Sequence, residues 1–510
     1  MLIEEQERAV RHTYGPALVS AGPGSGKTRV LTERTVELCQ ICDPAKICVI
    51  TFTQAAAKEM RERFTKIAGE KPVTFGTFHA VFLHWLMLWQ YLPPDIHIRT
   101  DEPDETKGRD QEEVPALFLG QGDARYDLTF DEIIYLTYRA VVRDGYRMDY
   151  QFYLIDEFQD IDPIQYEIVR YLTGPYGNLF AVGDEDQAIY GFRGASPHIM
   201  LQFLKDYPTA VHLYLSANFR CSPPILEASV RLIRNNRIRF DKQLRSVAKG
   251  HHPVRAQAYP DTLSELRAVA KGIRRRHLLQ GIPYEKMAVL TRTGVEADMV
   301  QEAFLEAGIP IIGKQEIAFI HKDFLLLERE KTVLEQAAKD RTDSNNRRIL
   351  TAYYPLLADE GRPDLMSSER IDLEQTVRTL ERLGEESSAL GVLDLWWHTA
   401  FGERMKEKRK KQGLPRGIFL LQFLRMLTPP AKKGVTVSTM HGAKGLEFDA
   451  VWLVGLNEGG MPRKEAVTEE ALEEERRVMY VALTRAKKNL SLSYTEEKPP
   501  SRYLTEMGLR

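Results

Sequence analysis

The 510-residue sequence is poor in cysteine, in long apolar runs and in net charge, and each shortage excludes a class of protein. Four cysteines are too few for a small disulfide-rich scaffold. The longest strongly apolar stretch, residues 81–89, contains a histidine and is far shorter than the roughly 20 residues of a membrane span. A formal net charge of -2 lacks the basic excess of an architectural nucleic-acid-binding protein, so any polynucleotide site must be a local groove.

Two short segments add expectations about location and metal binding. Residues 1–5 lack a basic segment followed by an apolar one, so we expect no secretory signal, no membrane partner and a cytoplasmic protein. Cys39 and Cys42 have the spacing of half a metal site, but no second closely spaced Cys or His pair completes it. Reduced, packed thiols are the favoured interpretation.

Patterning along the chain predicts an α/β fold. Short apolar runs alternate with helical patterns in both halves of the chain, which is typical of parallel sheets covered on both faces. The runs lie at residues 16–20, 47–52, 152–155, 179–182 and 211–215, and again at 287–290, 435–439, 450–454 and 490–494. Two charged stretches rich in helix formers, 82–130 and 322–430, interrupt these sets and are interpreted as helical insertions. We therefore predict two α/β lobes.

A glycine-rich loop follows the first apolar run. Residues 21–28 read Ala-Gly-Pro-Gly-Ser-Gly-Lys-Thr, with a strand pattern before them and a helix pattern after them, as a phosphate-binding loop requires. Gly22, Gly24 and Gly26 let backbone N–H groups converge on phosphate oxygens. Lys27 would reach the terminal phosphates and Thr28 would present its hydroxyl to Mg²⁺. The loop alone leaves kinase, GTPase, transporter and motor open.

Two adjacent carboxylates narrow this choice toward hydrolysis. Asp156 and Glu157 end the apolar run at 152–155, which places them at the carboxyl edge of the sheet. Asp156 is suited to hold Mg²⁺, and Glu157 is suited to orient and deprotonate an attacking water. Arg220 and Arg485 lie beyond the first set of strands, and arginines delivered from a second lobe would make hydrolysis depend on lobe closure.

Together with these motifs, the sequence resembles superfamily 1A helicases of the UvrD, PcrA and Rep type over nearly the whole chain. The matching segments, in the order that the family shows them, are residues 4–8, 21–28, 50–60, 76–79, 155–160, 182–194, 217–220, 437–448 and 473–486. The resemblance implies two RecA-like P-loop NTPase lobes with parallel sheets, each carrying a mostly helical insertion. The first lobe would comprise 1–81 and 131–215 with its insertion at 82–130, and the second 216–321 and 431–510 with its insertion at 322–430.

The resemblance also implies roles around ATP and Mg²⁺. Gln6 would read the adenine, Arg29 and Phe219 would sandwich it, and Glu447 would contact the ribose. Gln187 would sense the γ-phosphate, and Arg485 would be the second arginine finger. The resulting catalytic set is Lys27, Asp156, Glu157, Gln187, Arg220 and Arg485, with Thr28 and Asp156 as metal ligands. The nucleotide-binding set is Gln6, Gly22, Pro23, Gly24, Ser25, Gly26, Lys27, Thr28, Arg29, Phe219 and Glu447.

A motor that ignores base sequence needs backbone contacts and aromatic faces, each stacked base contributing about 1–3 kcal/mol. The candidate strand contacts inside the matching segments are Thr51, Phe52, Phe78, His79, Tyr190, Phe192, Arg193, Thr439 and His441. The family usually has Trp where this chain has Phe192, which predicts weaker stacking there. By contrast, Trp85 and Trp89 lie at helical spacing among apolar residues and are predicted core. The basic run 406–411 favours a solvated helix face, with duplex phosphates as the alternative.

The sequence thus predicts an ATP-dependent translocase or helicase on single-stranded DNA, with 3′-to-5′ travel implied by the resemblance. Its DNA substrate would carry a 3′ tail next to a duplex. Both insertions are short for the family, which leaves open a translocase that remodels protein–DNA complexes, or drives a nuclease partner, without unwinding. A nucleotide-gated DNA-binding subunit of a repair or phage-defence complex is the third hypothesis.

Overall fold

The computed structural model describes residues 2–92, 96–98, 126–191, 194, 196–250, 252–313 and 433–510. The chain divides into two compact units. Unit 1 comprises Met1–Gln257, Ala443–Val451 and Leu456–Arg510, and unit 2 comprises Ala258–Gly442 and Trp452–Gly455. Most of the predicted insertion 82–130 and all of 322–430 lie outside the described residues, as do Phe192, Arg193 and the basic run 406–411.

Unit 1 is built on a six-stranded sheet in the order β3-β2-β6-β7-β1-β8. Its strands are β1 (Ala17–Ala21), β2 (Ile47–Thr51), β3 (Thr74–Thr77), β6 (Phe152–Ile155), β7 (Asn178–Gly183) and β8 (Val211–Leu215). Every neighbouring pair is parallel. Buried positions run without a break through β1, β2 and β6, as expected of strands covered on both faces. All six carboxyl ends therefore meet at one edge of the sheet.

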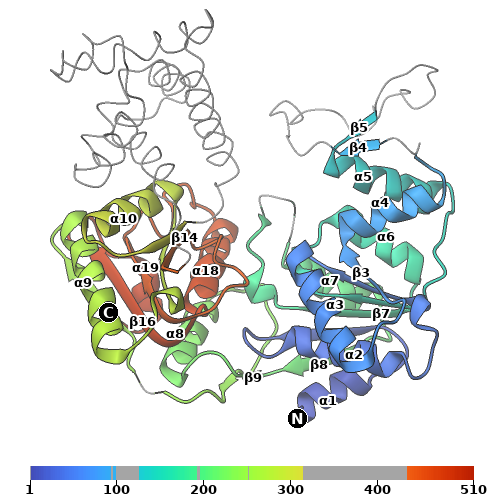
Figure 1. Cartoon of the computed structure of the whole chain (residues 1–510), viewed down its shortest axis with the longest axis horizontal. Helices are drawn as coiled ribbons and strands as arrows, with labels where there is room; N and C mark the ends of the chain where they lie inside the picture. Colours follow the sequence, from blue (N-terminus) through green and yellow to red (C-terminus); the bar gives the residue numbers. More distant parts are fainter. Residues whose placement is uncertain are drawn as a thin grey trace, which may run out of the picture. The chain divides into compact units, whose positions relative to one another are not determined.

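Helices cover both faces of this sheet, as Figure 1 shows. One face carries α1 (Glu4–Arg11), α2 (Lys27–Leu38) and α3 (Gln54–Ala68), and the other carries α4 (Phe78–Leu88), α5 (Phe130–Tyr138), α6 (Pro163–Thr173) and α7 (His198–Asp206). A separate apolar core fills each layer. Trp85 is 0% exposed in the second core, which confirms the prediction that it is a core residue, whereas Trp89 is only partly buried and packs against that core.

Capping residues begin several of these helices, and for α3 and α4 the cap lies at or just after the end of the preceding strand. Thr53 caps α3 by accepting from Ala56 N, and Thr77 caps α4 by accepting from Ala80 N. Asp162 caps α6, whose first residue is Pro163. Because caps follow strand ends closely, the polar residues of these connections stay at the carboxyl edge.

The remaining elements of unit 1 lie outside this sheet. They are η1 (Pro44–Lys46), β4 (Ile96–Ile98), β5 (Tyr126–Leu128), η3 (Arg139–Arg143), η4 (Phe158–Asp160), η5 (Glu185–Gln187), β9 (Ala217–Asn218), α8 (Pro223–Ile233), β10 (Arg245–Ser246), α18 (Glu469–Leu483), β16 (Ala486–Thr495) and α19 (Arg502–Glu506). Two more strands, β11 (Arg255–Tyr259) and β15 (Phe448–Leu453), have residues in both units.

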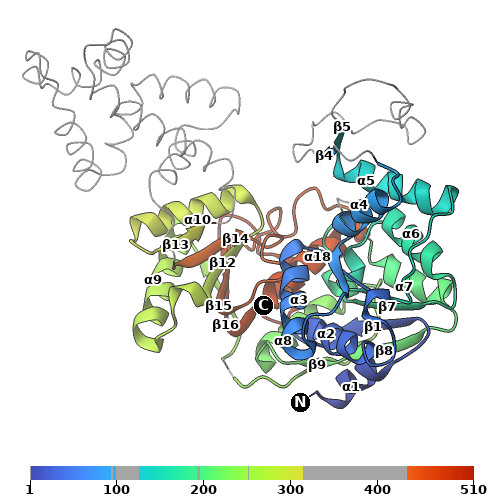
Figure 2. The ribbon, with the colours of Figure 1, turned by 45° about the vertical axis from the view of Figure 1, so that its right-hand side comes forward.

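Unit 2 contains a second parallel arrangement, visible in Figure 2. Its elements are α9 (Thr262–Gln280), η7 (Tyr284–Lys286), β12 (Met287–Thr291), α10 (Gly294–Glu306), β13 (Ile311–Gly313) and β14 (Val435–Thr439). Strand β14 pairs in parallel with β12 and with β13. The predicted α/β class with parallel sheets is confirmed.

Two further points concern the chain as a whole. Unit 1 includes all residues up to Gln257, whereas the sequence predicts that the second lobe starts at residue 216. The predicted lobe boundaries therefore stay a prediction. Within the described ranges, every helix is too short or too polar to span a membrane.

Candidate active site

The glycine-rich loop joins β1 to α2 in a conformation that only glycine adopts easily. Gly24 and Gly26 have φ angles of +62° and +85°. A Cβ at Gly26 would lie 2.8 Å from Gln6 Nε2, and one at Gly24 would lie 2.5 Å from the Cβ of Arg220. The loop is therefore enclosed by neighbouring side chains and has no room for a larger residue at these two positions.

The loop also fits a bound phosphate. Gln6 is 2% exposed, donates from Nε2 to Ser25 O at 2.9 Å, and accepts from Ile3 N at 3.2 Å. The Ser25 hydroxyl is buried and has no hydrogen-bond partner among the described residues. A buried hydroxyl without a partner at the N-terminus of α2, next to backbone N–H groups, is suited to phosphate oxygens. The residues present thus fit the nucleotide that the sequence predicts.

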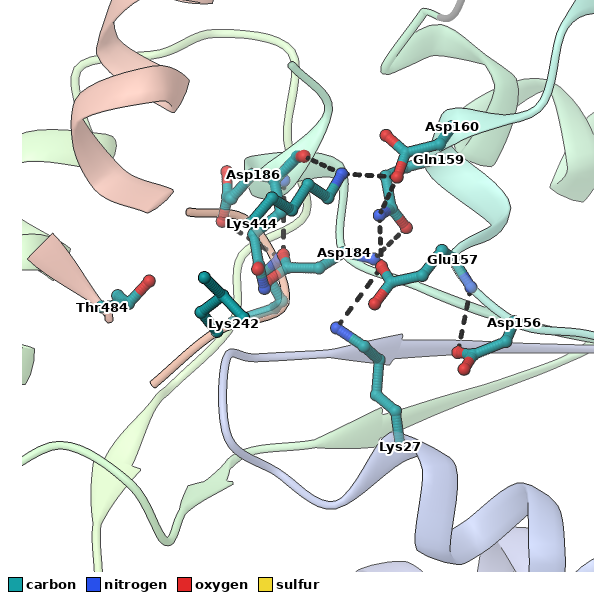
Figure 3. Close-up of polar contacts among 12 residues, drawn as sticks. Lys27, Asp156, Glu157, Gln159, Asp160, Asp184, Asp186, Lys242, Lys444 and Thr484 are labelled. Atoms are coloured by element: carbon teal, nitrogen blue, oxygen red, sulfur yellow. Dashed lines mark hydrogen bonds and ion pairs between the residues drawn. The ribbon is translucent and has the colours of Figure 1, made fainter. Parts of the chain in front are cut away.

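Asp156 and Glu157 follow β6 at the same edge of the sheet. Asp156 N donates to Ile50 O at 2.9 Å, and Glu157 N donates to Asp156 Oδ1 at 2.9 Å. Glu157 has a φ of +50°, which is rare for a residue other than glycine and is found most often at functional sites. Figure 3 shows the Lys27 ammonium pointing toward Glu157, with 3.8 Å between Lys27 Nζ and Glu157 Oε2.

The charges around these carboxyls act on them in opposite directions. Burial raises the pKa of Glu157, but Lys27 and Lys444 more than offset it, so the pKa lies below the usual range. Burial and the Glu157 charge raise the pKa of Asp156. An ionised Glu157 is what a general base needs, and a buried Asp156 whose charge is unfavourable would gain most from a cation. Asp156 therefore fits its predicted role as a Mg²⁺ ligand.

Both predicted arginines lie in unit 1 with the phosphate loop. Arg485 is 1% exposed, donates from Nε to Val481 O at 2.8 Å, and donates from Nη2 to Gln187 Oε1 at 3.2 Å. Burial lowers the pKa of Arg485 to about 9, so the guanidinium remains charged at neutral pH. Arg220 donates from Nε to Glu447 Oε2 at 2.9 Å. The two guanidinium groups share Thr484 as a partner: Arg220 Nη1 donates to its carbonyl oxygen at 3.5 Å, and Arg485 Nη2 donates to its hydroxyl at 3.0 Å.

Of the residues predicted to hold the base and ribose, Gln6 is buried, whereas Phe219, Arg29 and Glu447 are exposed. Phe219 is 47% exposed, and its N–H donates to Gly24 O at 3.0 Å. Arg29 lies in the first turn of α2, with its side chain 46% exposed. Glu447 also pairs with Lys487 at 2.5 Å. Burial raises the pKa of Glu447, but the Lys487 hydrogen bond and the Arg220 charge lower it by more. The pKa of Glu447 therefore lies below its usual value.

The strand-contact candidates lie in several different settings. Phe52 and Tyr190 stack with 5.2 Å between ring centroids and 14° between ring planes. Thr51 is buried at the end of β2, and its hydroxyl donates to Thr53 O at 3.0 Å. Phe78 is 4% exposed within the core, so its ring offers little surface to a ligand.

The remaining candidates lie near strand ends in different parts of the chain. His79 packs edge-on against Phe130 with 4.9 Å between ring centroids. Thr439 is the last residue of β14 in unit 2 and His441 follows it, and Thr439 Oγ1 accepts from Gly442 N at 3.1 Å.

Three further side chains tie the site together, although sequence reasoning gave them no role. Gln159 donates from Nε2 to Glu157 Oε2 at 2.6 Å and accepts at Oε1 from Asp184 N at 2.8 Å. Lys444 pairs with Asp160 and donates to Gln187 O at 2.8 Å. Burial raises the pKa of Asp160 to about 6 even beside Lys444. All three lie inside matching segments, but spacing alone does not say which side chains of two segments meet.

A phosphate loop at a helix N-terminus, faced by paired carboxylates from another strand end, defines a P-loop nucleotide hydrolase. Comparisons with known proteins specify the family. The UvrD/REP helicase N-terminal domain matches residues 2–92 and 106–208, and the UvrD-like helicase C-terminal domain matches 213–324 and 420–497. The chain belongs to the UvrD-like helicase family.

Individual relatives are similar over nearly the whole chain. The ATP-dependent DNA helicase PcrA of Staphylococcus epidermidis is 27% identical, covering 99% of this chain and 86% of the relative. The ATP-dependent DNA helicase UvrD2 of Mycobacterium tuberculosis is 27% identical, covering 99% and 81%. A protein of Rickettsia conorii named "Probable DNA helicase II homolog" is 27% identical, covering 99% and 95%.

Proposed function

We propose that this member of the UvrD-like family of ATP-dependent DNA helicases is a motor that hydrolyses ATP to travel 3′ to 5′ along single-stranded DNA. The observation that carries the proposal is the placement of Glu157. Its carboxylate faces Lys27 at 3.8 Å and connects through Gln159 to the segment that contains Gln187. The direction of travel rests on the family resemblance.

In this mechanism each group at the sheet edge has one task. The loop N–H groups and Lys27 bind the phosphates, and Thr28 and Asp156 would hold Mg²⁺, which when bound would supply positive charge that stabilises the phosphates. Glu157 accepts the proton of the attacking water. Arg220 and Arg485 stabilise the negative charge that develops on the departing phosphate.

Coupling to the strand would run through Lys444. Its ammonium pairs with Asp160, donates to Gln187 O at 2.8 Å, and lies 4.8 Å from the centroid of the Tyr190 ring. Tyr190 in turn stacks on Phe52. A rearrangement around the γ-phosphate would therefore reach a pair of rings on which DNA bases could stack.

The assignment of Glu157 has a direct test. We expect Glu157→Gln to lower strand-stimulated kcat by on the order of 100-fold or more while ATP affinity changes little, because only the proton acceptor is lost. Lys27→Ala should lose turnover as well as tight nucleotide binding. Glu167→Gln, which changes an exposed carboxylate on α6, is the matched control. Near-normal turnover in Glu157→Gln contradicts the assignment.

Helicase and translocase activity are separated by the substrate. A duplex with a 3′ tail should release its complementary strand, and one with a 5′ tail should not. Release from neither, together with ATP-dependent displacement of streptavidin from a biotinylated single strand, would identify a translocase that remodels protein–DNA complexes or drives a nuclease. Turnover that does not respond to single-stranded DNA would favour a nucleotide-gated subunit of a repair or phage-defence complex.

A further inference from the structure

A buried cluster of charge lies beside the active site and has no role in the mechanism above. Three consecutive carboxylates, Asp184, Glu185 and Asp186, called here the acidic triplet, have ligand oxygens within 4.8 Å of one another and are at most 1% exposed. Lys242, whose side chain is 1% exposed, lies between them. It pairs with Asp184, with Glu185 at 2.9 Å and with Asp186 at 3.0 Å.

The ammonium group makes this arrangement possible. Arg239 adds a second cation, donating to both oxygens of Asp186 at 3.1 and 3.0 Å. Burial lowers the pKa of Lys242, but the three carboxylates raise it more, so the ammonium keeps its charge at neutral pH. Removing one partner of a buried ion cluster leaves the others uncompensated. Lys242 is thus the cation that contacts all three carboxyl groups of the acidic triplet, whereas Arg239 donates to Asp186.

The contacts of Asp184 extend the cluster to the active site. Asp184 uses Oδ1 for Lys242 and Oδ2 to accept from Gln187 Nε2 at 2.6 Å. The same glutamine accepts at Oε1 from Arg485 Nη2 at 3.2 Å. Both ends of the Gln187 carboxamide are therefore fixed, one of them by a carboxylate that Lys242 orients. Figure 3 shows Asp184, Asp186 and Lys242 together beside Lys444.

The chain segment that carries Lys242 also contacts the helix that leads to Arg485. Asn236 donates to Glu473 O at 3.0 Å, and Arg237 N donates to Glu473 Oε1 at 2.8 Å, so this segment is attached to α18. Further along, Phe240 N donates to Glu185 Oε1 at 2.9 Å. Residues 236–242 thus join α18, which ends just before Arg485, to the acidic triplet.

We propose that Lys242 is a positioning residue for ATP hydrolysis: through Asp184 it holds the Gln187 carboxamide in line with Arg485 and the γ-phosphate. The inference rests on the proposed function. If Lys242 only neutralised charge, a cation at any position within the acidic triplet would serve equally well. The observed geometry does more, because the carboxylate that binds Gln187 takes the ammonium on its other oxygen.

The test is a double-mutant cycle between Lys242→Met and Gln187→Ala, with steady-state ATPase measured at saturating single-stranded DNA. Lys242→Met keeps a long, unbranched side chain at this position and removes its positive charge. We expect kcat to fall on the order of 10- to 100-fold, as for misplacement of a catalytic group, with KM for ATP within about threefold of wild type. Because both changes disable the same carboxamide, the double variant should turn over no more slowly than Gln187→Ala.

Two controls keep the result interpretable. Arg34→Met removes another buried cation of unit 1, one that lies over the Phe180 ring 4.2 Å from its centroid, and should change melting temperature without a comparable fall in kcat. If Lys242→Met does not fold, Lys242→Arg replaces it, because a planar guanidinium keeps the charge but cannot place a single ammonium among three carboxylates.

Each outcome has a defined meaning. Multiplicative losses in the double variant, or normal kcat in a folded Lys242→Met or Lys242→Arg, would overturn the role of Lys242. Failure of the underlying function looks different, since Gln187→Ala itself would then turn over normally, or wild type would show no strand-stimulated hydrolysis. A fall in kcat for Lys242→Met that is absent once Gln187 is removed supports the proposal.

Discussion

Gly24 is confined both by its backbone and by its neighbour. Its φ of +62° is left-handed, and a Cβ would meet the Arg220 Cβ at 2.5 Å. We expect Gly24→Ala to displace the loop or Arg220 and to lower kcat/KM for ATP by about tenfold or more, which steady-state ATPase assays measure. Gly281→Ala is the control, because Gly281 has a φ of +64° with nothing within 4 Å of a Cβ. Equal kcat/KM in both variants would contradict the contact argument.

Arg485 uses the fork of its guanidinium in three directions. It donates to Val481 O, to Leu446 O and to Gln187 Oε1, at 2.8, 3.2 and 3.2 Å. Lysine keeps the charge but cannot reproduce this geometry. Arg485→Lys should therefore lower strand-stimulated kcat by on the order of 100-fold or more, measured against Arg502→Lys, an arginine that is half exposed. Retained kcat in Arg485→Lys would show that charge alone suffices.

At the scale of elements, the sheet edge brings the β2–α3 connection to the segment after η5. Phe52 and Tyr190 stack there, although the two residues lie far apart in the sequence. We expect Phe52→Ala and Tyr190→Ala each to weaken single-stranded DNA binding by about 1–3 kcal/mol, measured by fluorescence anisotropy with an oligothymidine. Strand-independent turnover should change little. Tyr176→Ala, at a residue 74% exposed, is the control, and equal affinities in all variants would rule out base stacking on this pair.

His79, at the start of α4, leads to a prediction about how DNA affinity depends on pH. Burial lowers the pKa of His79, although Asp131 raises it in part, so the imidazole gains its proton only below its ordinary range. At neutral pH it can offer a hydrogen bond to a sugar or phosphate but no positive charge. The affinity ratio of wild type to His79→Asn should therefore stay constant between about pH 7 and pH 8. A ratio that rises as pH falls through this window would indicate a charged contact.

At the scale of the whole molecule, a motor and a static binding protein differ in their response to strand length. A protein that walks spends more ATP per binding event on a longer strand, so apparent kcat should rise with oligothymidine length and then reach a plateau. A nucleotide-gated subunit should instead respond equally to every strand that fills its site. Glu157→Gln, which binds but does not turn over in the proposed mechanism, serves as the background for this measurement.

The α/β class could be predicted because it depends on local pattern. Strands buried on both faces, such as β1 and β6, are read from continuous apolar runs between helical segments. The order β3-β2-β6-β7-β1-β8 could not be predicted from residue pattern alone, since a run of apolar residues does not specify its neighbour. That order is what brings the ends of β1 and β6 to the same edge.

Within the site, some residues could be proposed from local sequence pattern and others only from the folded structure. Lys27, Asp156 and Glu157 could be proposed from sequence, because each proposed task needs a residue type at a fixed place relative to a strand end or helix start. Gln159 and Lys242 were not, because their roles exist only through partners that folding supplies. Lys242 lies 58 positions from Asp184 in a stretch with no motif of its own. Sequence determined the chemistry of the phosphate site, whereas tertiary structure decided which buried charges hold that chemistry in place.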